Sequence, residues 1–163
     1  MNYDLERFKQ AQESGFPTAV RELRAGRKRS HWIWYVFPQL RGLGQSWQAL
    51  RYGLDGIGEA HAYLRDPLLR SNYREAVSVV HEQLGGRAQQ LDVLMGAWID
   101  AKKIVSSLTL FEHVARTLRP STGEDEGLDE LARLASEVLA IAETQGYPRC
   151  EFTIEQIRAS GGE

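Results

Sequence analysis

Apolar residues recur every three to four positions through most of the chain, which is the spacing of one face of an α-helix. Asp66-Pro67 is a helix cap followed by a first-turn proline, and it predicts a helix running to about Leu84, where two glycines follow. The clearest stripe predicts a helix over 128–144 and consists of Leu128, Leu131, Leu134, Ala135, Val138 and Leu139.

Further helices are predicted wherever a cap or a breaking residue brackets an apolar stripe. They cover residues 5–14, 18–25, 46–52, 59–65, 88–95 and 101–118. Gly15-Phe16-Pro17 is expected to separate the first two, and Thr153 with Gln156 forms a capping box for a last short helix. No segment offers a convincing strand partner. The predicted fold is therefore all-α: one compact domain over 1–163, with eight to ten mostly short helices.

A central buried aromatic helix is predicted between His31 and Phe37. Three of the four tryptophans fall between residues 32 and 47, and large aromatic side chains dominate core energetics. Although these residue types also favour strands, Ser30 is a good N-cap and Pro38 stands where a helix has to stop. We therefore expect the other helices to pack around this segment.

A basic cluster precedes the aromatic segment directly. Arg27, Lys28 and Arg29 lie in a window, residues 21–41, that holds six cations and one acidic residue, Glu22. Helix N-termini attract negative charge, so cations next to a helix start predict an anion site. The alternative is a solvated loop whose cations pair with glutamates.

Several neighbouring side chains complete the predicted site. His31 is the candidate catalytic residue, as a general acid or base near neutral pH; the alternative is a first-turn histidine hydrogen-bonded to backbone. The tryptophans either stack a ring of the ligand or belong to the core. The predicted ligand contacts from this region are Arg27, Lys28, Arg29, Ser30, Trp32, Trp34 and Gln39.

A second polar set lies on the predicted helix over 101–118. Lys102 and Ser106 are four residues apart and so share one helix face. They could contact a ligand hydroxyl or phosphate from the wall opposite Lys28. The alternative is that the serine hydroxyl bonds back to a helix carbonyl.

Composition narrows the function classes. The formal net charge of −2 makes nucleic acid an improbable partner for the 163-residue chain, and no apolar run reaches the length of a membrane span. The lone Cys150, the dispersed histidines and the missing phosphate-loop and dinucleotide fingerprints predict no metal and no cofactor. Because the first residues do not form a signal peptide, the expected compartment is the cytoplasm; the oligomeric state is left open.

The string G-R-K-R-S-H-W-I-W-Y-V-F-P-Q-L-R-G-L-G, from Gly26 to Gly44, is long enough to be specific. It resembles the bacterial domain-of-unknown-function family DUF1810, whose members are sometimes labelled "calpastatin". Later matches are Arg51-Tyr52-Gly53, 59–64, 66–69, 100–103 and 106–111. The resemblance covers about residues 4–118 and implies a compact, mainly helical domain without implying an activity. Residues 119–158 depart from the family pattern.

Two hypotheses follow. The first is a pocket for a small anionic or nucleotide-like metabolite, in a protein that could be an enzyme using His31 as acid or base. The second is a non-enzymatic interaction or regulatory module, in which the basic face docks an acidic partner and the acidic loop over 120–127 tunes binding.

Overall fold

The computed structural model describes residues 2–118 and 127–161, and within these ranges it contains nine α-helices and no strand. The all-α prediction is therefore confirmed. None of the described helices is both long and apolar enough to cross a membrane. The helices are α1 (Glu6–Arg24), α2 (Ile33–Val36), α3 (Trp47–Tyr52), α4 (Gly56–Arg65), α5 (Pro67–His81), α6 (Leu91–Leu94), α7 (Trp98–Thr117), α8 (Leu128–Thr144) and α9 (Glu151–Ala159), with a π-helical turn at Glu82–Gly86.

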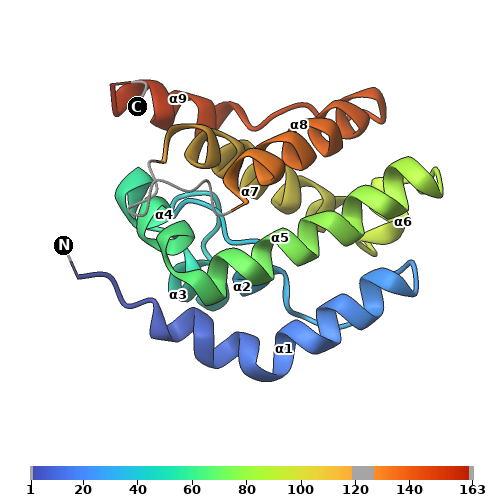
Figure 1. Ribbon diagram of the computed structural model, residues 1–163, viewed down its shortest axis with the longest axis horizontal. Helices are drawn as coiled ribbons and strands as arrows, with labels where there is room; N and C mark the ends of the chain where they lie inside the picture. Colours follow the sequence, from blue (N-terminus) through green and yellow to red (C-terminus); the bar gives the residue numbers. More distant parts are fainter. Residues whose placement is uncertain (1, 119–126, 162–163) are drawn as a thin grey trace.

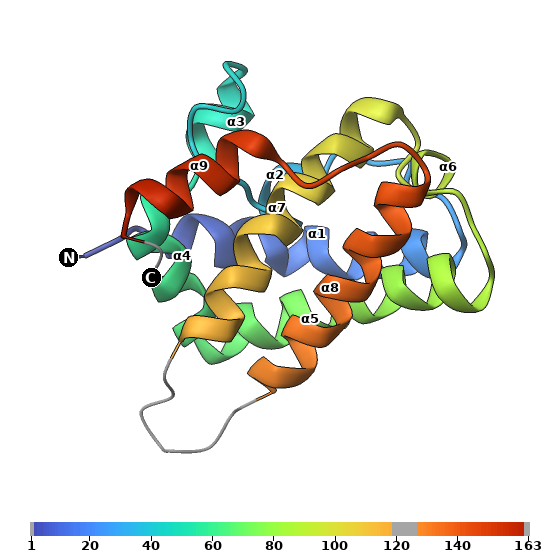
Figure 2. The same cartoon turned by 90° about the horizontal axis from the view of Figure 1, so that it is seen from above.

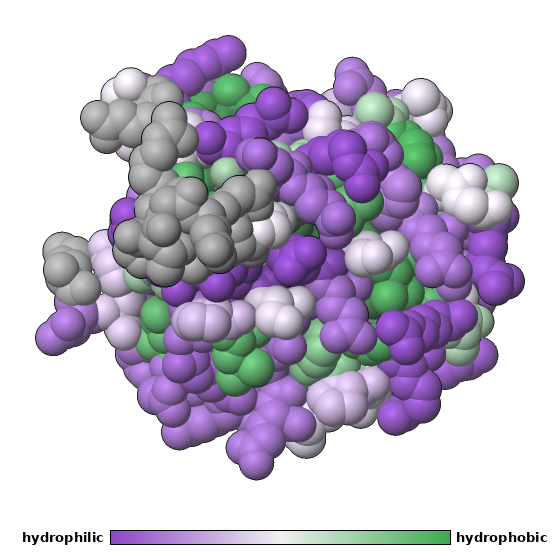
Figure 3. Space-filling model, in the orientation of Figure 1, coloured by the Kyte–Doolittle hydropathy of each residue, from purple (hydrophilic) through white to green (hydrophobic). Residues whose placement is uncertain are grey.

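Helix α5 crosses the middle of the molecule, with α1 on one side and α8 on the other (Figure 1). Helix α7 packs against α8 and α4. Aromatic rings from four helices meet at the centre: Tyr73 lies 4.6 Å from Phe111, centroid to centroid, and Tyr63 lies 5.1 Å from Phe8. The face in Figure 3 is mainly hydrophilic, with hydrophobic residues in small separate areas.

The N-terminal region forms one helix, so the prediction of two helices separated at Gly15-Phe16-Pro17 is wrong. Phe8 and Leu23, on either side of the break, are both fully buried on α1, and this burial outweighs the hydrogen bond that Pro17 cannot make. Figure 1 shows that α1 bends near its middle. Gly15 serves packing instead, because a Cβ there would lie 2.1 Å from the Tyr35 hydroxyl.

The aromatic segment is buried as predicted, but its helix is shorter. Trp32 and Phe37 are each 1% exposed, whereas α2 spans only Ile33–Val36, with Trp32 at its N-cap. Ser30 does not cap the helix because its hydroxyl donates to the Glu22 carboxylate of α1, at 2.5 Å. A contact distant in sequence thus displaces the local cap.

Some of the other predicted helix ends are confirmed and others are wrong: the helix predicted over 88–95 spans only Leu91–Leu94, and those predicted over 59–65 and 101–118 start earlier, at Gly56 and Trp98. Asp66 accepts the N–H groups of Leu68 and Leu69 at the start of α5, and α8 has the predicted bounds. The capping box at Thr153 is wrong: α9 starts at Glu151, and Thr153 is buried inside it. Of the acidic loop predicted over 120–127, residues 120–126 lie outside the described part of the chain.

Candidate functional site

The predicted anion-binding segment already encloses a carboxylate of the protein. Glu22 accepts hydrogen bonds from the main-chain N–H groups of Arg29 and Ser30, at 2.8 and 2.9 Å, and from the indole N–H of Trp32 at 2.9 Å. Burial raises the pKa of Glu22, but these bonds and the one from the Ser30 hydroxyl outweigh it and lower the pKa to about 2. An internal anion therefore occupies the main-chain donors of this loop.

Lys28, the middle cation of the cluster, is also engaged. It is 7% exposed, and its Nζ lies 2.9 Å from a carboxylate oxygen of Asp100 on α7. The same Nζ donates to the carbonyl of Ser30 at 2.6 Å and lies 5.1 Å from the Trp32 ring centroid. Gly96 allows the chain to approach Lys28 closely: its φ is +84°, and its backbone lies against the backbone of Lys28. The ion pair of Lys28 with Asp100 thus holds the basic cluster against the start of α7.

Arg27, Arg29 and His31, unlike Lys28, have exposed side chains. His31 precedes α2, so it is not part of the helix predicted between His31 and Phe37. The roles proposed for these residues in anion binding and in acid–base chemistry remain predictions.

A cleft of about 790 Å³ lies beside this segment, within the size range of small-molecule sites. Its floor is the first half of α7. One wall is formed by residues 39–46 and by Ala49 of α3. The other is residues 146–151, which run from the end of α8 to the first residue of α9 and cross over α7 (Figure 2). Four predicted ligand contacts line this cleft together: Trp34, Gln39, Lys102 and Ser106.

Asp100 joins the basic cluster to the cleft. Its carboxylate lies 2.9 Å from the ammonium of Lys28 and 3.6 Å from that of Lys103, which lines the cleft. Lys103 also lies 4.7 Å from the ring centroid of Trp34 in the cleft wall. Two cations thus share one carboxylate, and one positive charge is left over.

The same imbalance recurs at Glu112, further along α7. Arg149, which lines the cleft, pairs with this carboxylate, and so does Arg116, at 3.2 Å. Lys102 adds a further positive charge from the cleft floor, 5.7 Å from the Trp98 ring centroid. Five cations in and behind the cleft therefore meet two carboxylates, and two further carboxylates, the exposed Glu151 in the wall and Asp92 on the Tyr147 hydroxyl, offset two of the three remaining charges.

Two residues that line the cleft, Ser106 and Cys150, donate hydrogen bonds within the protein. The Ser106 hydroxyl donates to the Lys102 carbonyl at 3.0 Å, as the alternative interpretation expects. The main-chain N–H of Cys150 donates to the Thr109 hydroxyl at 3.2 Å and holds the 146–151 segment on α7. The walls are therefore fixed by bonds outside the open volume.

Sequence reasoning missed Trp98, Lys103 and Arg149. Lys103 has a signal, because it follows Lys102 within the family-like string Asp100 to Lys103. Arg149 has none: it reaches the cleft only through the packing of the segment between α8 and α9.

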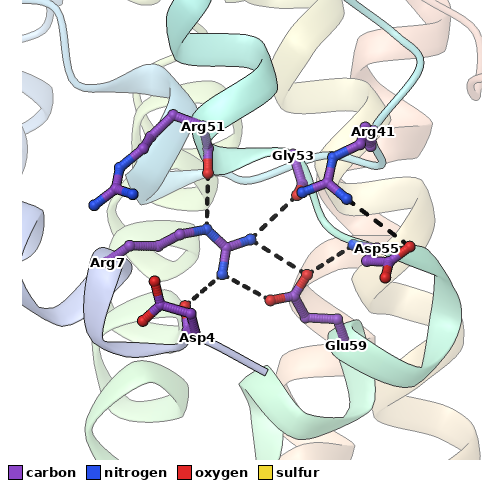
Figure 4. Close-up of polar contacts among 7 residues, drawn as sticks. All are labelled: Asp4, Arg7, Arg41, Arg51, Gly53, Asp55 and Glu59. Atoms are coloured by element: carbon purple, nitrogen blue, oxygen red, sulfur yellow. Dashed lines mark hydrogen bonds and ion pairs between the residues drawn. The ribbon is translucent and has the colours of Figure 1, made fainter. Parts of the chain in front are cut away.

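A second charged cluster, around Arg7, is closed, which means that all its donors are bonded within the protein (Figure 4). The Arg7 guanidinium donates twice to the Glu59 carboxylate, at 2.7 and 3.2 Å. Its other three N–H groups donate to the carbonyls of Asp4, Arg51 and Gly53. All five donors are used, and Arg7 and Glu59 are 7% and 2% exposed, so this cluster has no donor left for a ligand.

The structure is thus a compact all-α domain with a cationic, aromatic-lined cleft along one helix. The family model described as "Protein of unknown function (DUF1810)" matches residues 2–123, and the chain belongs to this family, which confirms the resemblance. The chain is similar to the conserved hypothetical protein Rv1873 from Mycobacterium tuberculosis, whose crystal structure matches with a TM-score of 0.74 and 36% sequence identity. That match covers 94% of this chain and 95% of the mycobacterial one. No curated protein matches the chain.

Proposed function

We propose that the cleft along α7 binds a small anionic or nucleotide-like metabolite. The observation that carries this proposal is the excess of positive charge. Asp100 and Glu112 each meet two cations, and Lys102 faces the cleft with the Trp98 ring as its neighbour. An anion in the cleft would relieve the repulsion among these cations.

The chemistry of the walls agrees with such a ligand. Trp34 and Trp98 offer ring faces, and Gln39 and Gln45 offer amide groups that can orient it. The proposal is one of binding. It gives His31 no acid–base role, because the exposed ring of His31 is not part of the cleft lining.

A thermal-shift screen with phosphorylated and carboxylated metabolites tests the proposal. We expect at least one compound to raise the melting temperature of the protein, and Lys102→Ala to abolish the rise. Arg27→Ala is the matched control, since it removes an exposed cation outside the cleft and should leave the rise intact. A screen without a stabiliser, or a rise lost equally in both variants, would overturn the proposal.

A second candidate function is docking of a protein partner, and a specific surface favours it. Six large apolar side chains are exposed among the described residues: Trp98 and Ile99 line the cleft, and Trp47 and Leu50 lie on α3 next in sequence to the lining residues Ser46 and Ala49. An acidic segment with one apolar anchor would suit this surface. Selection from a displayed peptide library should then yield acidic sequences whose binding is lost in Leu50→Asp. Metabolite binding should survive that substitution, because Leu50 is not part of the cleft lining.

A further inference from the structure

We infer that the cleft has an aromatic end and an anionic end, and that its ligand is a planar ring joined to a phosphate, the chemistry of a nucleoside monophosphate. This inference rests on the proposed function and deepens it. It assigns the ring to the start of α7, beside Trp98 and Tyr147. It assigns the phosphate to Lys102, one turn further along the helix, in the positive field of the cations beyond it.

The direction of the cleft follows from how residues 146–151 are anchored. At one end, the Tyr147 hydroxyl donates to the Asp92 carboxylate of α6, which precedes the start of α7, at 3.2 Å. At the other end, Cys150 is bonded to Thr109. Thr109 lies eleven residues after Trp98, which is about 16 Å along the helix axis. The segment therefore begins near the start of α7 and contacts the helix again near its middle.

The end near Tyr147 is aromatic and apolar. Trp98 is 61% exposed and Ile99 is 49% exposed, so both offer surface to a ligand. Tyr147 and Pro148 line the same cleft from the opposite wall. A flat ring between these surfaces would cover the exposed Trp98 face, and stacking of this kind tolerates any heteroaromatic base.

The other end carries the charge. Lys102 lies one helical turn beyond Trp98, and Ser106 lies two turns beyond it, which is about 6 and 12 Å along the axis. Arg149 lines the cleft further along, where it pairs with Glu112, ten residues or about 15 Å along the helix axis beyond Lys102. A phosphate monoester carries up to about two negative charges near neutral pH, and the Lys102 ammonium can bind its oxygens as a point charge. The charge of the ligand would thus be opposite in sign to the surplus of this cluster.

The test compares AMP with ribose 5-phosphate, which carries the same phosphate without the ring, by calorimetric titration. We expect AMP to bind at least tenfold more tightly. In Trp98→Ala this ratio should fall to about one, because the contact with the ligand ring is lost, whereas loss of the contact between Trp98 and Lys102 affects both compounds alike. Trp47→Ala is the matched control: it also removes an exposed tryptophan, 69% exposed, but one outside the cleft lining, and it should keep the ratio.

The outcomes separate the inference from the proposed function. If the two compounds bind equally tightly and both lose binding in Lys102→Ala, the cleft is an anion site without a ring subsite, and the inference is overturned while the proposed function stands. If the ratio falls as much in Trp47→Ala as in Trp98→Ala, the ring assignment is wrong. If neither compound binds, the nucleoside monophosphate class is rejected, and the metabolite screen described above decides the proposed function separately.

Discussion

The Arg7 cluster and the α7 cleft use the same kinds of charged group in opposite ways. At Arg7, one guanidinium meets one carboxylate and three carbonyls, and every donor is used. In and behind the cleft, two carboxylates are shared by four cations, and Lys102 has the Trp98 ring as its neighbour. The closed cluster joins α1 to α4 and to the chain between α3 and α4. The cleft keeps positive charge facing its open volume.

This difference shows how to separate structural charges from candidate functional ones. A buried charge that is fully satisfied fixes a conformation, and removing it exposes the energetic cost of burying its partner. A surplus of like charge around a cleft adds little to stability and is most economically explained by a ligand of opposite sign. The predictions below test this division.

The largest effect is expected at the closed cluster. Arg7→Met leaves the Glu59 carboxylate buried and unpaired, which should lower the free energy of unfolding by about 3–5 kcal/mol. Urea denaturation measures this change. Arg41→Ala is the control: it removes an exposed guanidinium 3.9 Å from Asp55, and a pair of this kind is worth at most about 1 kcal/mol. Equal losses in the two variants would contradict the assignment of Arg7 as a structural residue.

A variant that lacks both buried charges tests whether the ion pair or the carbonyl contacts of Arg7 hold this region together. In Arg7→Met with Glu59→Leu, no charge is left buried, and apolar groups of similar volume replace the pair. We expect this double variant to be more stable than either single variant by urea denaturation. A double variant as unstable as Arg7→Met would mean that the carbonyl contacts of Arg7, rather than its ion pair, hold this region together.

The next effect concerns Glu22 and depends on pH. Its pKa of about 2 lies below the ordinary value of 4.5, so its contribution is complete above about pH 4.5 and is lost as the pH falls toward 2. The shift corresponds to up to about 3 kcal/mol.

Glu22→Gln should therefore flatten the acid limb of the stability curve, measured by denaturation between pH 5 and pH 2. Glu137→Gln, at an exposed carboxylate whose pKa is lowered by hydrogen bonds from His81 and Arg133, should flatten it less. An acid limb unchanged in Glu22→Gln would show that the anion inside the basic loop does not stabilise the fold.

The smallest effect on stability is expected in the cleft. Lys102→Ala removes one cation from a surplus, and we expect the free energy of unfolding to change by less than about 0.5 kcal/mol. The rise in melting temperature given by a bound anion should nevertheless disappear. A large loss of stability in this variant, measured without added anions, would mean that Lys102 is a structural residue like Arg7.

Local features of the fold were predictable from the sequence, because their determinants are neighbours along the chain. The Asp66 cap and the α8 stripe are of this kind, and the structure confirms both. The predicted break at Pro17 and the predicted cap at Ser30 failed for the opposite reason. In each case a partner distant in sequence, the packing surface around α1 or the Glu22 carboxylate, outweighs a local preference.

The candidate site was predictable only in part. The basic string lies beside the cleft, but its cations do not line it: Lys28 is bound to Asp100, and Arg27 is exposed outside the cleft. Lys102 was found because it shares a helix face with Ser106. Arg149 could not be found from sequence spacing, since only tertiary packing brings it to α7.

One measurement tests most directly whether the anion site is the α7 cleft rather than the basic loop. The chain has four tryptophans, and each gives one indole N–H resonance in an NMR spectrum, assignable by replacing each with Phe. Trp34 and Trp98 line the cleft, Trp32 is bonded to Glu22 in the basic loop, and Trp47 is outside both. On titration with AMP, our account predicts that the resonances of Trp34 and Trp98 move together while that of Trp32 stays in place. Movement of the Trp32 resonance while those of Trp34 and Trp98 stay in place would contradict it.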